Sequence, residues 1–277
     1  LELDRRQIEE KIFRIKKELE QVNQTRLIQR KQRKRTATPV CALVGYTNAG
    51  KSSLLNALTG SDTFVEDKLF ATLDPTTRKL PISEASSVLI TDTVGFISRL
   101  PHTLINAFRS TLEEAAYADL LLIVVDASDA EYEAQYNQVC AVLKEIQAEQ
   151  VSSIIVLNKM DLVAQSPEHL AELKLKFPNA VNVSARTRQG FTNLLERITV
   201  ELLGSEDSYM IPLEKSNLVE LARKNGTITK ENWTATDVQL TARIPGTISE
   251  DGKASTRTLS LLLPYRTKGE NDGLYTL

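Results

Sequence analysis

The fold is decided by residues 45–52, which read Gly45-Tyr46-Thr47-Asn48-Ala49-Gly50-Lys51-Ser52. This is the pattern G-x-x-x-x-G-K-S, placed between the apolar run Val40–Val44 and a helical pattern over Lys51–Leu58. Its glycines let the backbone wrap around a phosphate, so that N–H groups and the helix N-terminus face negative charge. We therefore expect Lys51 to reach the β- and γ-phosphates of a nucleotide and the Ser52 hydroxyl to ligate Mg²⁺.

A second motif, Asp92-Thr93-Val94-Gly95, follows the strand-like run Val88–Thr91. An aspartate at the carboxyl end of a strand suits an indirect contact to Mg²⁺ through the groups that bind the ion. Gly95 can offer its backbone N–H to the γ-phosphate because no side chain stands in the way. After a phosphate-binding loop, this motif predicts a triphosphate site.

The third motif, Asn158-Lys159-Met160-Asp161, predicts which base is bound. It follows the strand-like run Ile154–Leu157. A carboxylate here can accept hydrogen bonds from the ring N–H and the exocyclic amine of guanine, whereas adenine has neither donor in that place. A site built to accept hydrogen bonds from donors that a competing base lacks discriminates against that base by about 10⁴ or more. Asp161 therefore favours GTP over ATP.

A fourth segment, Ser184-Ala185-Arg186, follows the run Ala180–Val183. The tripeptide alone is uninformative, but its position after the guanine motif in the series of motifs gives it weight. We expect the Ala185 backbone N–H to meet the guanine carbonyl oxygen.

A loop between the first two motifs reads Phe70-Ala71-Thr72-Leu73-Asp74-Pro75-Thr76-Thr77-Arg78. A threonine here should complete the coordination of Mg²⁺ and sense the γ-phosphate, and its release after hydrolysis would be the switch. Position alone allows Thr72 or Thr76, and we choose Thr72.

The complete predicted site has three parts. Catalytic roles fall to Lys51, Thr72 and Gly95, and the metal ligands are Ser52 and Thr72. The nucleotide contacts are Gly45, Tyr46, Thr47, Asn48, Ala49, Gly50, Lys51, Ser52, Ser53, Phe70, Ala71, Thr72, Leu73, Asp74, Asp92, Thr93, Val94, Gly95, Asn158, Lys159, Met160, Asp161, Ser184, Ala185 and Arg186.

Strand and helix patterns alternate from residue 40 to residue 203. The strand-like runs are Val40–Val44, Arg78–Ile82, Val88–Thr91, Leu120–Val125, Ile154–Leu157 and Ala180–Val183. The helical patterns are Lys51–Leu58, Leu104–Ala116, Glu131–Gln147, Pro167–Leu175 and Phe191–Leu203. Such alternation predicts an α/β fold with a mostly parallel sheet covered by helices on both faces. Combined with the nucleotide motifs, it predicts the fold of a P-loop GTPase of the Ras-like kind.

Segments of different character flank this region. Residues 1–36 predict a long amphipathic helix that ends in basic residues, and residues 37–204 form the predicted G domain. The basic end is either a solvated linker or a contact to an RNA backbone. After Gly204, residues 205–277 predict a small α+β domain with strands at Tyr209–Leu213, Val238–Ile244 and Thr258–Leu263 and a helix at Ser216–Lys224.

The bulk composition is that of an ordinary soluble protein. The chain has 277 residues, 25% charged side chains and a formal net charge of −2, so charge alone does not indicate nucleic acid. The apolar runs are too short to span a bilayer, and no secretory leader is visible. We expect a cytoplasmic monomer without membrane insertion, in which Cys41 and Cys140 are small core residues. Since the chain begins at Leu1 rather than Met, we also expect a fragment.

Together, these motifs resemble the HflX GTPases, a branch of the translation-factor class. The resemblance depends on the loop Phe70–Arg78, on Asp92-Thr93-Val94-Gly95-Phe96 and on the opening Leu1–Arg6, which is similar to the start of that family's linker helix. It covers residues 1 to about 204 well. It implies a GTPase that binds GTP, GDP and the large ribosomal subunit through rRNA, with a role in splitting or rescuing ribosomes, and it maps the Mg²⁺ threonine onto Thr72.

Two local departures bear on mechanism. Many small GTPases have a glutamine that orients the attacking water where this chain has Phe96, so we expect slow intrinsic hydrolysis. His102, the nearest downstream imidazole, reads as a surface histidine at a helix start. Asn48 resembles the asparagine of GTPases that hold K⁺ beside the phosphates. Its alternative role is to stabilise the turn.

Two other functions compete with the ribosome-associated switch. One is a GTPase that partners an RNA-modification, ribosome-assembly or metal-uptake system, which Asn48 and Phe96 allow. The other is a hydrolysis-poor scaffold that only binds guanine nucleotide. The complete set of Lys51, Ser52, Thr72 and Asp92 argues against a scaffold, which needs no complete Mg²⁺ site.

Overall fold

The computed structural model describes residues 38–60, 76–82, 86–93, 95, 115–163, 166–246 and 256–267. The helix predicted over residues 1–36 lies outside these ranges, as does the loop from residue 70 to residue 75. The helix predicted over Leu104–Ala116 is described only at its last two residues, which are helical.

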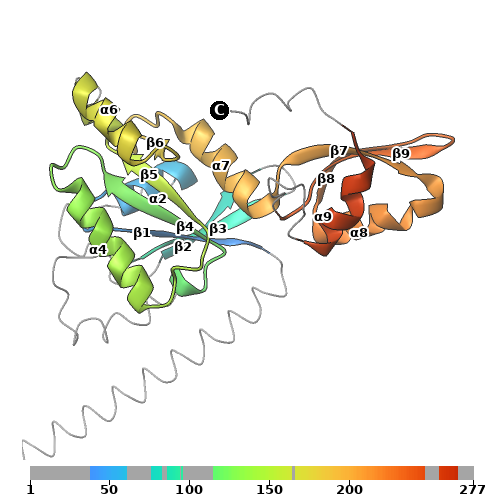
Figure 1. The fold of residues 1–277 in the computed structure, drawn as a ribbon, viewed down its shortest axis with the longest axis horizontal. Helices are drawn as coiled ribbons and strands as arrows, with labels where there is room; N and C mark the ends of the chain where they lie inside the picture. The colour runs from blue at the N-terminus through green and yellow to red at the C-terminus, as the bar shows by residue number, and fades with distance from the viewer. Residues whose placement is uncertain are drawn as a thin grey trace, which may run out of the picture.

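The first sheet has six strands in the order β2-β3-β1-β4-β5-β6 (Figure 1). The strands are β1 (Val40–Gly45), β2 (Thr76–Pro81), β3 (Ser87–Asp92), β4 (Leu120–Asp126), β5 (Ser153–Asn158) and β6 (Val181–Asn182). All neighbouring pairs are parallel except β2 and β3, which are antiparallel. The predicted α/β fold with a mostly parallel sheet is therefore confirmed.

Strand β4 runs through the middle of the core and is buried at every position. Its side chains alternate between the two faces of the sheet, as the period of a strand requires. Leu121, Ile123 and Val125 belong to one hydrophobic cluster, while Leu120, Leu122 and Val124 belong to the other. The continuous apolar sequence of β4 thus reflects a strand covered on both faces.

Helices cover both faces of this sheet (Figure 1). The helices are α2 (Lys51–Thr59), α4 (Tyr132–Glu145), α5 (Met160–Val163), α6 (Pro167–Lys176) and α7 (Phe191–Leu203). Buried side chains of α4, α5 and α6 join one cluster, and those of α2 and α7 join the other. No helix among the described residues is both long and apolar enough to cross a membrane.

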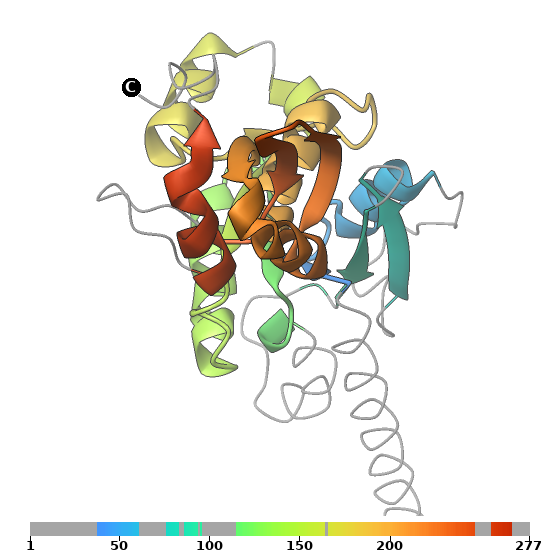
Figure 2. The ribbon, with the colours of Figure 1, turned by 90° about the vertical axis from the view of Figure 1, so that its right-hand side faces the viewer.

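A second sheet follows Gly204 and faces the viewer in Figure 2. Its order is β10-β7-β9-β8, and every neighbouring pair is antiparallel. The strands are β7 (Glu206–Pro212), β8 (Thr227–Trp233), β9 (Asp237–Arg243) and β10 (Arg266–Thr267). Helices α8 (Asn217–Asn225) and α9 (Arg257–Leu262) share a hydrophobic cluster with the inward side chains of β7 and β9. Short 3-10 turns lie at Leu213–Lys215 and Leu263–Tyr265.

The prediction of a strand at Thr258–Leu263 was wrong, because this segment lies almost entirely within the helix α9. The Thr256 hydroxyl accepts a hydrogen bond from the Leu259 N–H at 3.3 Å, which caps the helix start. Leu259 and Leu262 then lie one helical turn apart and are both buried. A short apolar run fits either a strand or a buried helix, and the capping threonine decides between them here.

Contacts also join the two sheets. The Ser86 and Thr227 hydroxyl oxygens lie 3.2 Å apart, beside β3 and in β8. Arg243 of β9 also donates at 3.2 Å to the carbonyl of Gly204, which lies in the connection between α7 and β7. Gly204 has φ +84°, and a Cβ at this position would lie 2.1 Å from the Ile244 carbonyl oxygen, so this connection requires glycine.

The position of β4 predicts a large difference between two Leu→Ala substitutions. Leu122 is fully buried, whereas Leu175 on α6 is 86% exposed. We expect Leu122→Ala to lower the free energy of unfolding by about 2–5 kcal/mol through lost burial and a cavity. Leu175→Ala should change it by less than about 0.5 kcal/mol. Urea denaturation of both variants measures this, and equal losses would contradict the described core.

Candidate nucleotide-binding site

The predicted site segments meet at the carboxyl ends of the parallel strands of the first sheet. In the parallel pairing, Leu43 lies beside Asp92, Gly45 beside Val124 and Asp126 beside Asn158. Because parallel strands end on the same side, the loops after β1, β3 and β5 emerge together. The structure thus brings the phosphate loop, Asp92 and the guanine motif together at the carboxyl end of the sheet.

Gly50 fixes the contact between the phosphate loop and the guanine motif. Its backbone is left-handed, with φ +89°, and it directly precedes α2. A Cβ at Gly50 would lie 2.3 Å from Asn158 Nδ2. Any other residue would therefore be strained and would push Asn158 away, which explains the second glycine of the loop.

Lys51 folds back onto its own loop. It is 6% exposed, and its Nζ donates to the carbonyl oxygens of Gly45 at 3.2 Å and Tyr46 at 2.8 Å. Burial lowers the pKa of Lys51 to about 8, although the charge of Asp92 partly opposes this. The ammonium group is thus held in a site where a phosphate can replace the two carbonyls.

Ser52 and Asp92 form the part of the site that suits Mg²⁺. The Ser52 hydroxyl donates to Asp92 Oδ2 at 2.6 Å, and Asp92 is 2% exposed. A hydroxyl next to a buried carboxylate is a set of hard oxygen donors, which Mg²⁺ prefers. Thr72 lies outside the described residues, and Thr76 lies at the start of β2, paired with Asp92.

Gly95 lies against the phosphate loop. A Cβ on Gly95 would lie 2.9 Å from Lys51 Nζ and 2.9 Å from Thr47 Cα. The segment before it is fixed, because the buried Thr93 hydroxyl donates to the Leu43 carbonyl at 2.7 Å. The backbone of Gly95 can approach a phosphate beside Lys51 only because it carries no side chain.

The Asn158 side chain bridges two loops. Its Nδ2 donates to the Ala49 carbonyl at 2.9 Å, and its Oδ1 accepts from the Ala185 N–H at 3.0 Å. Asn158 is 1% exposed, so the amide links phosphate loop and Ala185 segment inside the protein. The bond also occupies the N–H that we expected to meet the guanine carbonyl, and a bound base has to share or replace it.

Asp161 is oriented by Ser184. The Ser184 hydroxyl donates to Asp161 Oδ1 at 2.6 Å and accepts from the Thr187 N–H at 3.1 Å. A carboxylate accepts about four hydrogen bonds, so Asp161 keeps capacity for two donors of a base. Ser184 is fully buried, which makes it a support for Asp161.

The remaining predicted residues differ in their exposure. Thr47, Ala49 and Met160 are buried, Tyr46 and Ser53 are half-buried, and Asn48 and Arg186 are exposed. Asn48 has φ 62°, a left-handed conformation that asparagine tolerates. Outside the described residues lie Phe70, Ala71, Leu73, Asp74 and Val94.

Sequence reasoning missed Asp126 at the end of β4. Its Oδ2 lies 2.6 Å from Lys159 Nζ. An acidic residue directly after the apolar strand Leu120–Val125 was the available signal, because neighbouring parallel strands end side by side.

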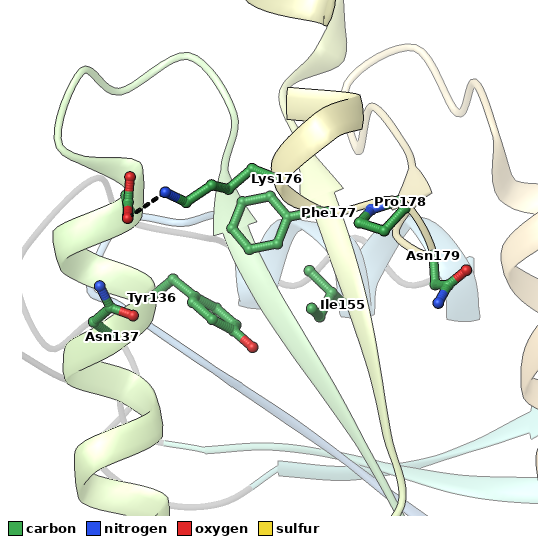
Figure 3. A pocket seen from close by; sticks show the side chains of 8 residues that line it. Tyr136, Asn137, Ile155, Lys176, Phe177, Pro178 and Asn179 are labelled. Atoms are coloured by element: carbon green, nitrogen blue, oxygen red, sulfur yellow. Dashed lines mark ion pairs between the residues drawn. The ribbon is translucent and has the colours of Figure 1, made fainter. Parts of the chain in front are cut away.

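A cavity of about 240 Å³ lies apart from this site (Figure 3). Tyr136 of α4, Ile155 of β5 and Phe177 after α6 point into it, beside the Glu133–Lys176 ion pair at 2.5 Å. It shares no residue with the phosphate loop or the guanine motif.

The fold and the motifs at its strand ends define the class of P-loop GTPases. A family model described as "50S ribosome-binding GTPase" matches residues 40–159. The chain is 42% identical over 252 residues to the GTPase HflX of Caldanaerobacter subterraneus subsp. tengcongensis, covering 90% of this chain and 57% of that relative. It is 37% identical over 249 residues to the GTPase HflX of Escherichia coli, covering 88% and 58%. The chain belongs to the HflX family of GTPases.

The chain spans about half the length of the curated relatives that it matches. A solved GTP-binding protein of Sulfolobus solfataricus in complex with GDP is 26% identical to this chain, and the match covers 63% of this chain and 55% of that protein with a TM-score of 0.43.

The orientation of Asp161 predicts a change of base preference. We expect Asp161→Asn to weaken GDP binding by about 10²-fold or more, because the amide cannot accept from both guanine donors. It should favour xanthosine diphosphate, whose C2 carbonyl accepts from the new N–H. Fluorescence titration with both nucleotides tests this. Asp119→Asn, at the opposite end of the sheet, is the matched control and should leave both affinities unchanged.

The lowered pKa of Lys51 predicts that nucleotide affinity depends on pH. Phosphates favour the charged ammonium, so the bound state has the higher pKa, and binding takes up a proton once the free lysine has lost it. GDP affinity should therefore stay flat near pH 7 and fall as pH rises above about 8. Calorimetry in buffers of different ionisation enthalpy measures the proton uptake, and a flat profile up to pH 9 would contradict the burial of Lys51.

Proposed function

We propose that this chain binds GTP and GDP with Mg²⁺ and acts as a slow GTPase switch on the large ribosomal subunit. The observation that supports it most is the Asn158 bridge, which joins the phosphate loop at Ala49 to the guanine segment at Ala185. One nucleotide can therefore contact a phosphate site and a base site that are held in fixed positions.

On the phosphate side, each residue has a distinct task. Lys51 exchanges the carbonyls of its own loop for phosphate oxygens and neutralises their charge. Ser52 and Thr72 would hold Mg²⁺, with Asp92 contacting the ion indirectly through the Ser52 hydroxyl. The ion would supply further neutralisation of the phosphate charge. Gly95 would donate its backbone N–H to the γ-phosphate next to Lys51.

On the base side, Asp161 selects guanine. Ser184 fixes the carboxylate, so recognition does not require ordering Asp161 at the moment of binding. A base that lacked the two donors would leave this carboxylate desolvated without compensation. The specificity for guanine over adenine follows from that cost.

Hydrolysis by the chain alone should be slow. The position after Gly95 holds Phe96, whose side chain can neither donate nor accept a hydrogen bond to the attacking water. Water positioning must then come from a partner or from a reordered loop, with the loop threonine Thr72 as the sensor of the γ-phosphate.

The ribosome is the proposed partner because of family membership. The matching family is described as ribosome-binding, and the relatives are named as HflX GTPases. The basic segment before residue 36 would supply contacts to the rRNA backbone. Splitting or rescue of ribosomes is our proposal for the whole protein, of which this chain spans about half.

The domain organisation is part of this proposal. We place the G domain at residues 37–204 and a smaller α+β domain at residues 205–277, after the helical segment 1–36. The separate hydrophobic cluster of the second sheet supports this division. A K⁺ ion beside Asn48 stays a hypothesis, and the left-handed backbone of Asn48 supports the turn-stabilising alternative.

The proposed partner predicts stimulated turnover. Alone, the chain should hydrolyse GTP at well below about 1 s⁻¹, since unaided GTPases can be as slow as about 10⁻⁴ s⁻¹. Purified large ribosomal subunits should raise this rate at least about tenfold, whereas small subunits should not. Phosphate release is measured with each subunit, with Lys51→Ala as the inactive control. GTP binding without stimulation by large subunits would refute the ribosome as the activator of this chain.

A further inference from the structure

We propose that Asp126 is a positioning residue for guanine-nucleotide binding and acts through Lys159. This inference rests on the proposed function and deepens it, because it assigns a role in the base site to a residue outside the four motifs. Its basis is the way in which both ends of the Lys159 side chain are held.

Strand pairing places Asp126 beside the guanine motif. Asp126 of β4 is the partner of Asn158 of β5, each the last residue of its strand. The pairing continues one step further, since the Ala127 N–H donates to the Asn158 carbonyl at 3.0 Å. The residue that follows Asn158 therefore emerges next to the Asp126 side chain.

The Asp126 carboxylate is held by Ser128, independently of the lysine. Its Oδ1 accepts from the Ser128 N–H at 3.0 Å and from the Ser128 hydroxyl at 2.6 Å. Asp126 is 8% exposed, so little water competes for these bonds. The other oxygen, Oδ2, lies 2.6 Å from Lys159 Nζ.

The backbone end of Lys159 is fixed as well. Lys159 has φ 63°, a left-handed conformation that few residues with a Cβ adopt. It directly follows Asn158, whose amide is bonded on both sides, and it stands two residues before Asp161. With its Cα and its Nζ both held, the four-carbon stem of Lys159 loses its rotamer freedom before a nucleotide arrives.

A fixed lysine at this place can aid binding because its stem offers an apolar surface to a purine held by Asp161, without a further loss of side-chain entropy on binding. Asp126 contributes to this effect only by holding Lys159 in place. The effect therefore requires Lys159, and the role of Asp126 should vanish when Lys159 is removed.

A purely structural ion pair predicts something different. If Asp126 only stabilised the β4–α4 turn, its loss would lower the melting temperature with or without Lys159. It would not alter nucleotide dissociation through that lysine. The two roles therefore separate in a double-mutant cycle, which isolates the coupling between two residues.

The test measures GDP dissociation by fluorescent-nucleotide chase for the wild type, Asp126→Asn, Lys159→Met and the double variant. Asparagine keeps an oxygen for Ser128 while removing the charge that faces Lys159. We expect Asp126→Asn to speed dissociation about tenfold in the wild-type background and less than about twofold in the Lys159→Met background. Asp126→Glu, which keeps the charge, should recover most of the loss.

The control is Glu133→Gln, which removes the acid from the Glu133–Lys176 ion pair of α4 and α6. It should leave dissociation unchanged. An unchanged rate in Asp126→Asn, or equal effects in both backgrounds, would overturn the inference while GDP binding by the wild type upholds the proposed function. Failure of the wild type to bind GDP would overturn the proposed function and this inference with it.

Discussion

The site depends on one buried side-chain amide, that of Asn158. Parallel pairing brings several loops to the same edge of the sheet, but it does not fix their distance from one another. Asn158 does so, by donating to the Ala49 carbonyl and accepting from the Ala185 N–H. A buried amide left with one partner would cost about 1–3 kcal/mol. The phosphate loop and the base segment are therefore stabilised as one unit, and Gly50 leaves the space that this amide needs.

Around this amide, the charged groups are arranged in fixed and mutually supporting pairs. Asp92 receives the Ser52 hydroxyl, Asp161 receives the Ser184 hydroxyl, and Asp126 pairs with Lys159. Each carboxylate is held by a neighbour that lies in another part of the sequence. Such support from neighbours is what fixed binding geometry requires, since a site loses affinity when its groups must be ordered by the ligand.

Motifs with their own backbone requirements could be predicted from the sequence, as could the β-α alternation. The glycines of residues 45–50 and the carboxylates of Asp92 and Asp161 can be recognised from the local sequence alone. Asp126 could not be assigned in this way, because its partner Lys159 is set by strand register rather than by spacing. The segment Thr258–Leu263 was misassigned as a strand, since its apolar run fits both periods and only the bond from Leu259 to Thr256 reveals the helix.

The self-bonded state of Lys51 bears on how nucleotide leaves. A buried ammonium left without hydrogen-bond acceptors after the phosphates leave would be strongly unfavourable, and that cost would slow nucleotide release. Here the carbonyl oxygens of Gly45 and Tyr46 can accept the hydrogen bonds that the phosphates give up. The barrier to product release therefore does not include the full cost of stranding a cation. The resting loop thus offers the ammonium a second set of acceptors once the phosphates have left.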